Sequence, residues 1–162
     1  MIFLKWLLML PIFFASTLVA YVLAPIAVLF RREYSLKGTP FWWITTPNCD
    51  LRGDPDHQER WRHRNCYLQF LTWIWRNPSV NFQREHLGVH VEPSDIRVED
   101  GNWQYVKRNG KTTAWMYFLE KRYGSSKHGL RVLLGWKVWD AHKKDPLQMT
   151  CRITPWKSFK EQ

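Results

Sequence analysis

One short segment holds the side chains best suited to chemistry, since Asp50, Asp54, Asp56 and His57 fall within eight positions. Carboxylates beside an imidazole could act as general acid and base in a hydrolase or a transferase, and crowded oxygen ligands suit hard cations. The spacing, however, matches neither an EF-hand loop nor a zinc signature. Asp54 can instead cap a helix that begins at Pro55, with acidic side chains in its first turn. We favour this helix cap, and an enzyme that uses the four residues is the alternative.

The remaining candidates for chemistry are weaker. His86 and His90 fall on one side of an alternating segment, but two histidines alone are a poor ligand set. Cys49, Cys66 and Cys151 lack metal-ligand or redox spacing, and we expect them to be free thiols. The sequence has no phosphate-binding loop, nucleophile elbow or zinc-binding helix motif. We therefore expect no metal and no cofactor.

An uncharged, almost wholly apolar run extends from Trp6 to Phe30, with Lys5 before it and Arg31 and Arg32 behind it. As a helix this run would be about 37 Å long, enough to cross a hydrocarbon core of about 30 Å. The run is longer than a typical signal-peptide core, and Pro25 would follow the best cleavage site at once. We expect an uncleaved transmembrane anchor rather than a cleaved signal.

Positive charge follows the apolar run more closely than it precedes it. Arg31, Arg32 and Lys37 lie just after the run, so we expect the chain beyond it to face the cytoplasm. Lys5 is the only cation among the first 30 residues, which leaves 23 Lys and Arg against 14 Asp and Glu in the rest. This balance suits a bilayer with anionic headgroups or an acidic partner. Because 16% of residues are aromatic, membrane-proximal binding of nucleic acid is a further alternative.

Tryptophans and cations supply the predicted contact residues. Trp rings favour the headgroup level of a bilayer, although they also fill protein cores. We expect the membrane boundary to be contacted by Trp42, Trp43, Trp73 and Trp75. We expect lipid phosphates or an acidic partner to be bound by Arg31, Arg32 and Lys37.

The rest of the chain predicts an α+β fold. Apolar residues at helical spacing indicate one amphipathic helix over residues 55–76, where Asn77 and Pro78 end it. Alternation of period two then predicts strands, and Asn109-Gly110 is a strong hairpin signal. The strands are expected near residues 86–91, 95–99, 103–107, 112–121, 130–139 and 148–153. Short links favour an antiparallel meander or partial barrel of five to six strands, with the helix packed on it.

This pattern divides the chain into three expected segments. Residues 1–30 form a transmembrane anchor, residues 31–54 a juxtamembrane connector, and residues 55–162 a small cytoplasmic domain. About 130 residues outside the bilayer suffice for one hydrophobic core.

Several short motifs carry a family resemblance. They are the Thr-Pro-Asn-x-Asp-Leu-x-Gly-Asp stretch at 46–54, Arg76-Asn77 at the end of a Trp-rich helix, and Gly-Trp-Lys-Val at 135–138. With the apolar N-terminus, they resemble a family of small, uncharacterised membrane proteins of tailed bacteriophages. The resemblance implies a phage origin and a host inner-membrane location, and it implies no activity.

We therefore expect a membrane-anchored, non-enzymatic interaction protein. It would bind a host membrane protein or a cytoplasmic partner, in host takeover or superinfection exclusion. The sequence sets neither the partner nor the oligomeric state.

Overall fold

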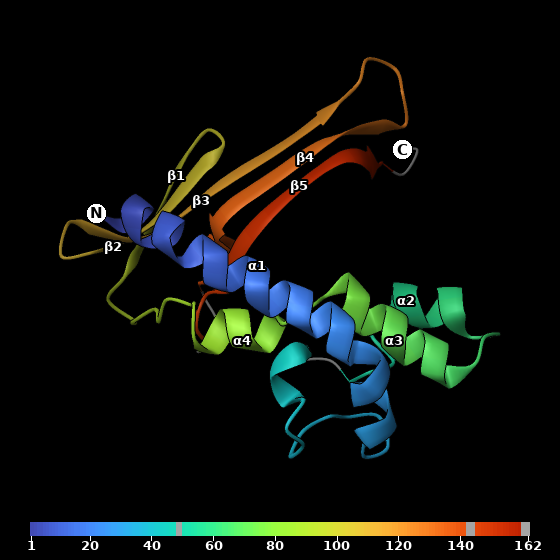
Figure 1. The fold of residues 1–162 in the computed structure, drawn as a ribbon. Helices are drawn as coiled ribbons and strands as arrows, with labels where there is room; N and C mark the ends of the chain where they lie inside the picture. Colours follow the sequence, from blue (N-terminus) through green and yellow to red (C-terminus); the bar gives the residue numbers. More distant parts are fainter. Residues whose placement is uncertain (48–49, 142–144, 160–162) are drawn as a thin grey trace. The chain divides into compact units, whose positions relative to one another are not determined.

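The computed structural model describes residues 1–47, 50–141 and 145–159. Cys49 lies outside these ranges. The fold is α+β, with an N-terminal apolar helix, further helices and an open antiparallel sheet (Figure 1). The helices are α1 (Ile2–Ala27), α2 (Pro55–Trp61), α3 (Cys66–Arg76) and α4 (Val80–Glu85), with 3₁₀ turns η1 (Val28–Phe30), η2 (Trp42–Ile44) and η3 (Val138–Asp140). The strands are β1 (Ile96–Asp100), β2 (Trp103–Arg108), β3 (Lys111–Arg122), β4 (His128–Trp136) and β5 (Met149–Ser158).

The chain divides into two compact units, which differ from the three segments expected from the sequence. The sheet unit comprises Met1–Leu10 and the chain from Leu87 onward. The helical unit is Pro11–His86. The boundary falls inside α1, next to Pro11, which has no backbone N–H for the helical hydrogen-bond ladder.

The sheet is the predicted meander, with strand order β1-β2-β3-β4-β5 and every pair antiparallel. It is open and does not close into a barrel. Asn109 and Gly110 both have positive φ, 49° and 74°, as a two-residue hairpin turn requires. The predicted strand at 86–91 is absent, and Val89 makes only an isolated bridge to Leu147.

The last strand is longer than expected. The strand expected at 148–153 continues through Pro155 to Ser158. A proline is tolerated here because β5 is an edge strand, so the missing N–H breaks no inner ladder. The Pro155 carbonyl also accepts a hydrogen bond from the Tyr123 hydroxyl at 2.9 Å.

The single helix predicted over 55–76 is two helices. Asn65 begins the second one, because its side-chain Oδ1 accepts a hydrogen bond from the Tyr67 N–H at 2.8 Å. The sequence between α2 and α3 is polar and exposed, so no apolar contact holds the chain in one straight helix. Both helices belong to the helical unit, and the sheet belongs to the other.

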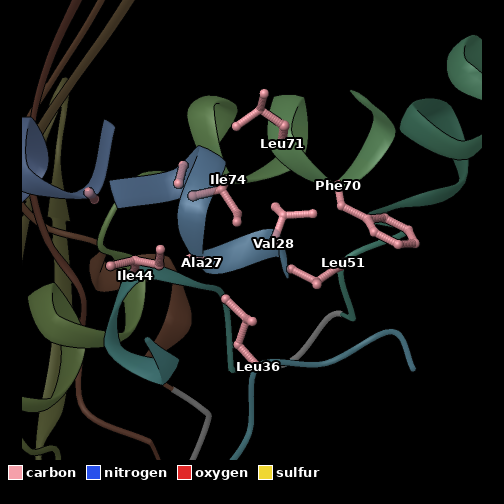
Figure 2. Packing of buried hydrophobic residues seen from close by; sticks show 10 residues of the cluster. Ala27, Val28, Leu36, Ile44, Leu51, Phe70, Leu71 and Ile74 are labelled. Atoms are coloured by element: carbon pink, nitrogen blue, oxygen red, sulfur yellow. The ribbon is translucent and has the colours of Figure 1, made fainter. Parts of the chain in front are cut away.

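The core of the helical unit forms where α1 and η1 meet α3 and the loops around η2 (Figure 2). Val28, Leu36, Ile44 and Ile74 are almost fully buried there. The α1 residues in this core include Ala20, Ala24 and Ala27, together with the neighbouring buried Ser16. Their spacing of three or four residues places these small side chains on one helix face, which permits close approach of the packed chain.

In the sheet unit, the first turns of α1 cover one end of a sheet face. The Phe3 ring stacks on Trp115 with centroids 4.7 Å apart, and the Trp6 ring meets the edge of Trp115 at 5.2 Å. Trp103 also contacts Phe3, at 6.1 Å. This aromatic cluster covers part of one sheet face.

Candidate membrane-binding surface

The outer face of α1 and η1 is apolar and exposed. Large apolar side chains on this face are between 42% and 69% exposed, whereas the small residues on the opposite face are buried. The exposed ones are Phe3, Leu4, Leu7, Leu8, Ile12, Phe14, Leu18, Val19, Tyr21, Val22, Ile26, Leu29 and Phe30. A row this long is far larger than the scattered apolar residues of ordinary protein surfaces and marks a membrane or protein contact. The helix is also long and apolar enough to span a bilayer.

Nearby residues of the helical unit extend this surface. Trp75, 39% exposed, donates a hydrogen bond from Nε1 to the Tyr21 carbonyl at 3.2 Å. Leu68 on α3 is also exposed. The ring of Trp75 therefore lies beside an exposed part of α1, where an interfacial Trp is expected.

The other three tryptophans predicted at the membrane boundary are less exposed than Trp75 or already packed against protein. Trp73 is only 5% exposed, and its ring lies tilted against the His57 ring with centroids 5.2 Å apart. Its Nε1 donates a hydrogen bond to the Thr46 hydroxyl at 3.3 Å. Trp73 is therefore a core residue. Trp42 and Trp43 are half-buried, and Trp43 packs edge-on against Phe82 at 6.0 Å.

The three predicted phosphate-binding cations differ in exposure. Arg32 and Lys37 are exposed, so their charged groups are free to meet a headgroup. Arg31 is half-buried, donates from Nη1 to the Val28 carbonyl at 3.1 Å, and lies 5.4 Å from the centre of the Phe70 ring. It therefore caps the end of η1 as well as carrying charge.

The acidic cluster has structural partners. Asp54 caps α2 as predicted, because its Oδ1 accepts from the His57 N–H at 2.8 Å, and it pairs with Arg76 at 3.1 Å. Asp50 pairs with Arg52 at 2.6 Å. Burial opposes ionisation of Asp50, but the hydrogen bonds and charge of Arg52 outweigh it and hold the Asp50 pKa below its ordinary value.

His57 is 2% exposed, and its Nε2 hydrogen-bonds the Gln69 carbonyl at 2.9 Å. Its imidazole is thus engaged in joining α2 to α3. Asp56 is exposed in the first turn of α2. Among the described residues, no group of three or more His, Cys, Asp and Glu side chains is arranged to hold a metal ion.

Among the residues that the structure describes, His86, His90, Cys66 and Cys151 belong to no group of three or more possible metal ligands. His86 packs on the Phe82 ring at 4.8 Å, whereas the His90 carbonyl accepts a hydrogen bond from Arg108 at 3.1 Å. Cys66 is a free, exposed thiol at the start of α3. Cys151 is free and half-buried, and burial raises the pKa of its thiol.

A second exposed apolar area lies on the sheet unit, at residues for which the sequence predicted no contact role. Cross-strand register aligns Leu119, Val132 and Ile153 in one row, on the face whose other end Phe3 and Trp6 cover. Ile153 is 62% exposed and Trp156 is 74% exposed. Ile153 lies in the strand expected at 148–153 and Trp156 lies beyond it, where a register shift between β4 and β5 interrupts simple alternation. Which face of the sheet is covered depends on long-range packing.

Comparison with curated proteins and with solved structures gives no match. Comparison with protein families gives one match that covers almost the whole chain, residues 1–161. On that evidence the chain belongs to DUF7338, a family of unknown function.

Proposed function

We propose that the protein binds a lipid bilayer through the exposed side of α1 and holds a basic folded chain at the membrane surface, where it interacts with a partner without catalysis. The observation that carries this proposal is the continuous row of exposed large apolar side chains from Phe3 to Phe30. Removing such side chains from water is worth about 1.5–3 kcal/mol each when burial is complete. A bilayer can bury such side chains in the part of α1 that belongs to each unit.

Charge supports the bilayer as the surface that is bound. Lys5 stands at one end of the apolar row, and Arg32 and Lys37 are exposed beyond the other. Each cation near an anionic leaflet contributes about 1 kcal/mol, and the attraction falls within a Debye length. The formal charge of +10 adds a long-range attraction to the same surface.

The family resemblance adds a biological setting to this proposal. A tailed-phage protein of this kind would bind the cytoplasmic face of the host inner membrane and engage a host membrane protein or cytoplasmic partner. Host takeover and superinfection exclusion are the corresponding roles. The engaged side chains of Asp54 and His57 favour an interaction protein over the hydrolase or transferase alternative.

Vesicle flotation tests the lipid part of the proposal. The full chain, purified in detergent and mixed with phosphatidylcholine vesicles before detergent removal, should float with them. Added phosphatidylglycerol should strengthen binding, and the triple variant Arg31→Gln, Arg32→Gln, Lys37→Gln should lose most of that gain. A matched control, Arg64→Gln, Lys111→Gln, Lys127→Gln, removes three exposed charges elsewhere and should keep more of it.

Two results would contradict the proposal. If folded protein stays in the aqueous fraction with both vesicle types, the lipid role fails. If a short oligonucleotide binds the folded protein and prevents its flotation, nucleic acid is the preferred ligand. The partner is tested separately by pull-down of the tagged protein from bacterial membranes, where a stoichiometric protein supports the interaction role and its absence opposes it.

A further inference from the structure

The N-terminal end of α1 is bound to the sheet. Phe3 and Trp6 pack on Trp115 with ring centroids 4.7 and 5.2 Å apart. Trp6 also donates from Nε1 to the Thr150 carbonyl on β5 at 3.3 Å. The start of the helix is therefore on the same side of any bilayer as the strands, whose edges and loops carry many charged residues.

The C-terminal part of α1 is bound to the helical unit. The Tyr67 hydroxyl on α3 donates to the Pro25 carbonyl at 2.9 Å, and Ser16 lies within hydrogen-bond distance of Ser79, 3.2 Å between hydroxyls. Gln83 of α4 donates to the Thr17 hydroxyl at 3.3 Å. This part of the helix is therefore on the same side as α3 and α4.

The chain that follows α1 and η1 stays on one side of a bilayer, because none of its described helices is long and apolar enough to cross it. Within the described residues, α1 with η1 is the one helical segment long and apolar enough to span. The described chain after Phe30 therefore has no segment that could return through the hydrocarbon. Both ends of α1 consequently contact parts of the chain that share one side.

We propose that α1 lies along one leaflet of the bilayer and does not cross it. The proposal rests on the membrane-binding function above and specifies its geometry. The exposed side of the helix enters the boundary between headgroups and acyl chains, as interfacial helices do. The opposite side, with Ser16, Ala20 and Ala24, is covered by the protein.

This geometry explains why α1 lacks the polar face of ordinary interfacial helices. Such helices need polar side chains where they face water. In this protein that side faces packed residues, so small and apolar side chains are required there. The polar residues that face water come from the parts of the chain that pack on α1.

The second apolar area of the sheet unit fits the same arrangement. Ile153 and Trp156 are exposed on the sheet face that the first turns of α1 cover. Lys121 is exposed on this face as well. A helix lying along the leaflet brings this face towards lipid, where Trp and Lys favour the headgroup level.

Depth measurements test the geometry in the membrane-bound full chain. A spin label is attached to single cysteines in a background with Cys49, Cys66 and Cys151 replaced by serine. The labelled sites are Leu4, Leu8, Leu18, Val22 and Leu29, with Lys127 as the control outside the lipid. A helix along the leaflet gives similar shallow depths at all five sites. A crossing helix puts Leu18 near the bilayer centre and separates Leu4 from Leu29 by about 37 Å.

Sidedness gives a second readout. A membrane-impermeant maleimide is added outside sealed vesicles that carry Lys5→Cys or Ser125→Cys protein in the same background. Reaction of both sites, or protection of both, supports the leaflet geometry. Reaction of only one overturns it. If Lys5→Cys impairs folding, a cysteine placed before Met1 replaces it.

The proposed function and this geometry fail in different ways. Protein that floats with vesicles but shows a deep Leu18 and opposite sidedness keeps the membrane role and loses the leaflet geometry. Protein that does not float loses the membrane role, whatever its labelling.

Discussion

The indole Nε1 of Trp6 donates a hydrogen bond to the main-chain carbonyl of Thr150, at 3.3 Å, across 144 positions of sequence. Together with the stacking of Phe3 on Trp115, it ties the first helical turns to the edge strand of the sheet. The sequence of α1 predicts a separate membrane anchor, but its first turns belong to the folded sheet unit.

Replacing Trp6 measures how strongly this tie holds. Trp6→Phe keeps an aromatic ring but removes the donor, and we expect a loss of about 1 kcal/mol in the free energy of unfolding. Trp6→Ala also removes the half-buried ring, and we expect about 2 kcal/mol. Denaturant unfolding in detergent micelles checks both values. Leu8→Ala, at a side chain 69% exposed, should change little, and equal stability of all three variants would refute the tie.

Gly135 in β4 has φ +96°, and an added Cβ would lie 2.2 Å from the Trp115 carbonyl oxygen. Backbone cannot move aside cheaply, so we expect Gly135→Ala to lower the free energy of unfolding by about 3 kcal/mol or more. Gly124 has φ +55° but open space around it, and Gly124→Ala should cost only about 1 kcal/mol. Thermal unfolding of both variants measures the difference. Similar melting temperatures would show that the close approach is absent.

Local sequence signals predicted the turns and helix starts that they encode. The remaining features of the fold depend on contacts between residues far apart in the sequence. Asn109-Gly110 specified its hairpin because both residues tolerate positive φ. Asp54 and Pro55 specified the start of α2 for similarly local reasons. The break between α2 and α3 was missed, because a short polar stretch that contains arginines is compatible with a continuous helix.

The candidate membrane-binding surface also could be predicted only where local sequence determines it. Length and composition sufficed to identify α1 as a lipid-binding candidate. The burial of Trp73 could not be predicted, because exposed and buried tryptophans on a helix look alike until their neighbours are known. For the same reason Ile153 and Trp156 were missed. Alternation assigns residues to two sheet faces but does not say which face is covered.

Substitutions of Asp54 distinguish a structural role of this residue from a catalytic one. Asp54→Ala removes the acceptor for the His57 N–H and should lower the free energy of unfolding by about 1 kcal/mol. Asp54→Asn keeps a capping oxygen and loses only the exposed pair with Arg76, so we expect a loss of under about 0.5 kcal/mol. Chemical denaturation measures both. If Asp54→Asn abolishes the biological effect in cells while stability is kept, the enzyme alternative gains support.

Asp95 gives the fold a defined dependence on pH. Its side chain is 1% exposed and accepts two hydrogen bonds from Arg108, at 2.7 and 2.8 Å, which lower the Asp95 pKa. A carboxyl whose pKa is lower in the folded state stabilises the fold above its unfolded pKa. That contribution disappears as the pH falls through the folded pKa.

We therefore expect the melting temperature of the wild type to fall on acidification below the ordinary range of Asp titration. Asp95→Asn should be less stable near neutral pH and should show a shallower dependence over the same acidic window. Melting curves from neutral to acidic pH check this, with exposed Asp100→Asn as the control. A slope identical in wild type and Asp95→Asn would exclude Asp95 as its source.

Opposite faces of α1 should respond differently to substitution. Leu18 is 65% and Val22 is 66% exposed, so Leu18→Ser with Val22→Ser should leave folding in detergent nearly unchanged. The double variant removes about 3 kcal/mol of apolar transfer energy, which predicts about 100-fold weaker vesicle partitioning. Ala24 is fully buried in the helical core, and Ala24→Leu should lower the free energy of unfolding by about 1–3 kcal/mol through overpacking. Vesicle co-flotation and denaturant unfolding, measured on both variants, separate the two effects. Equal partitioning of Leu18→Ser/Val22→Ser and wild type would mean that lipid does not contact this face.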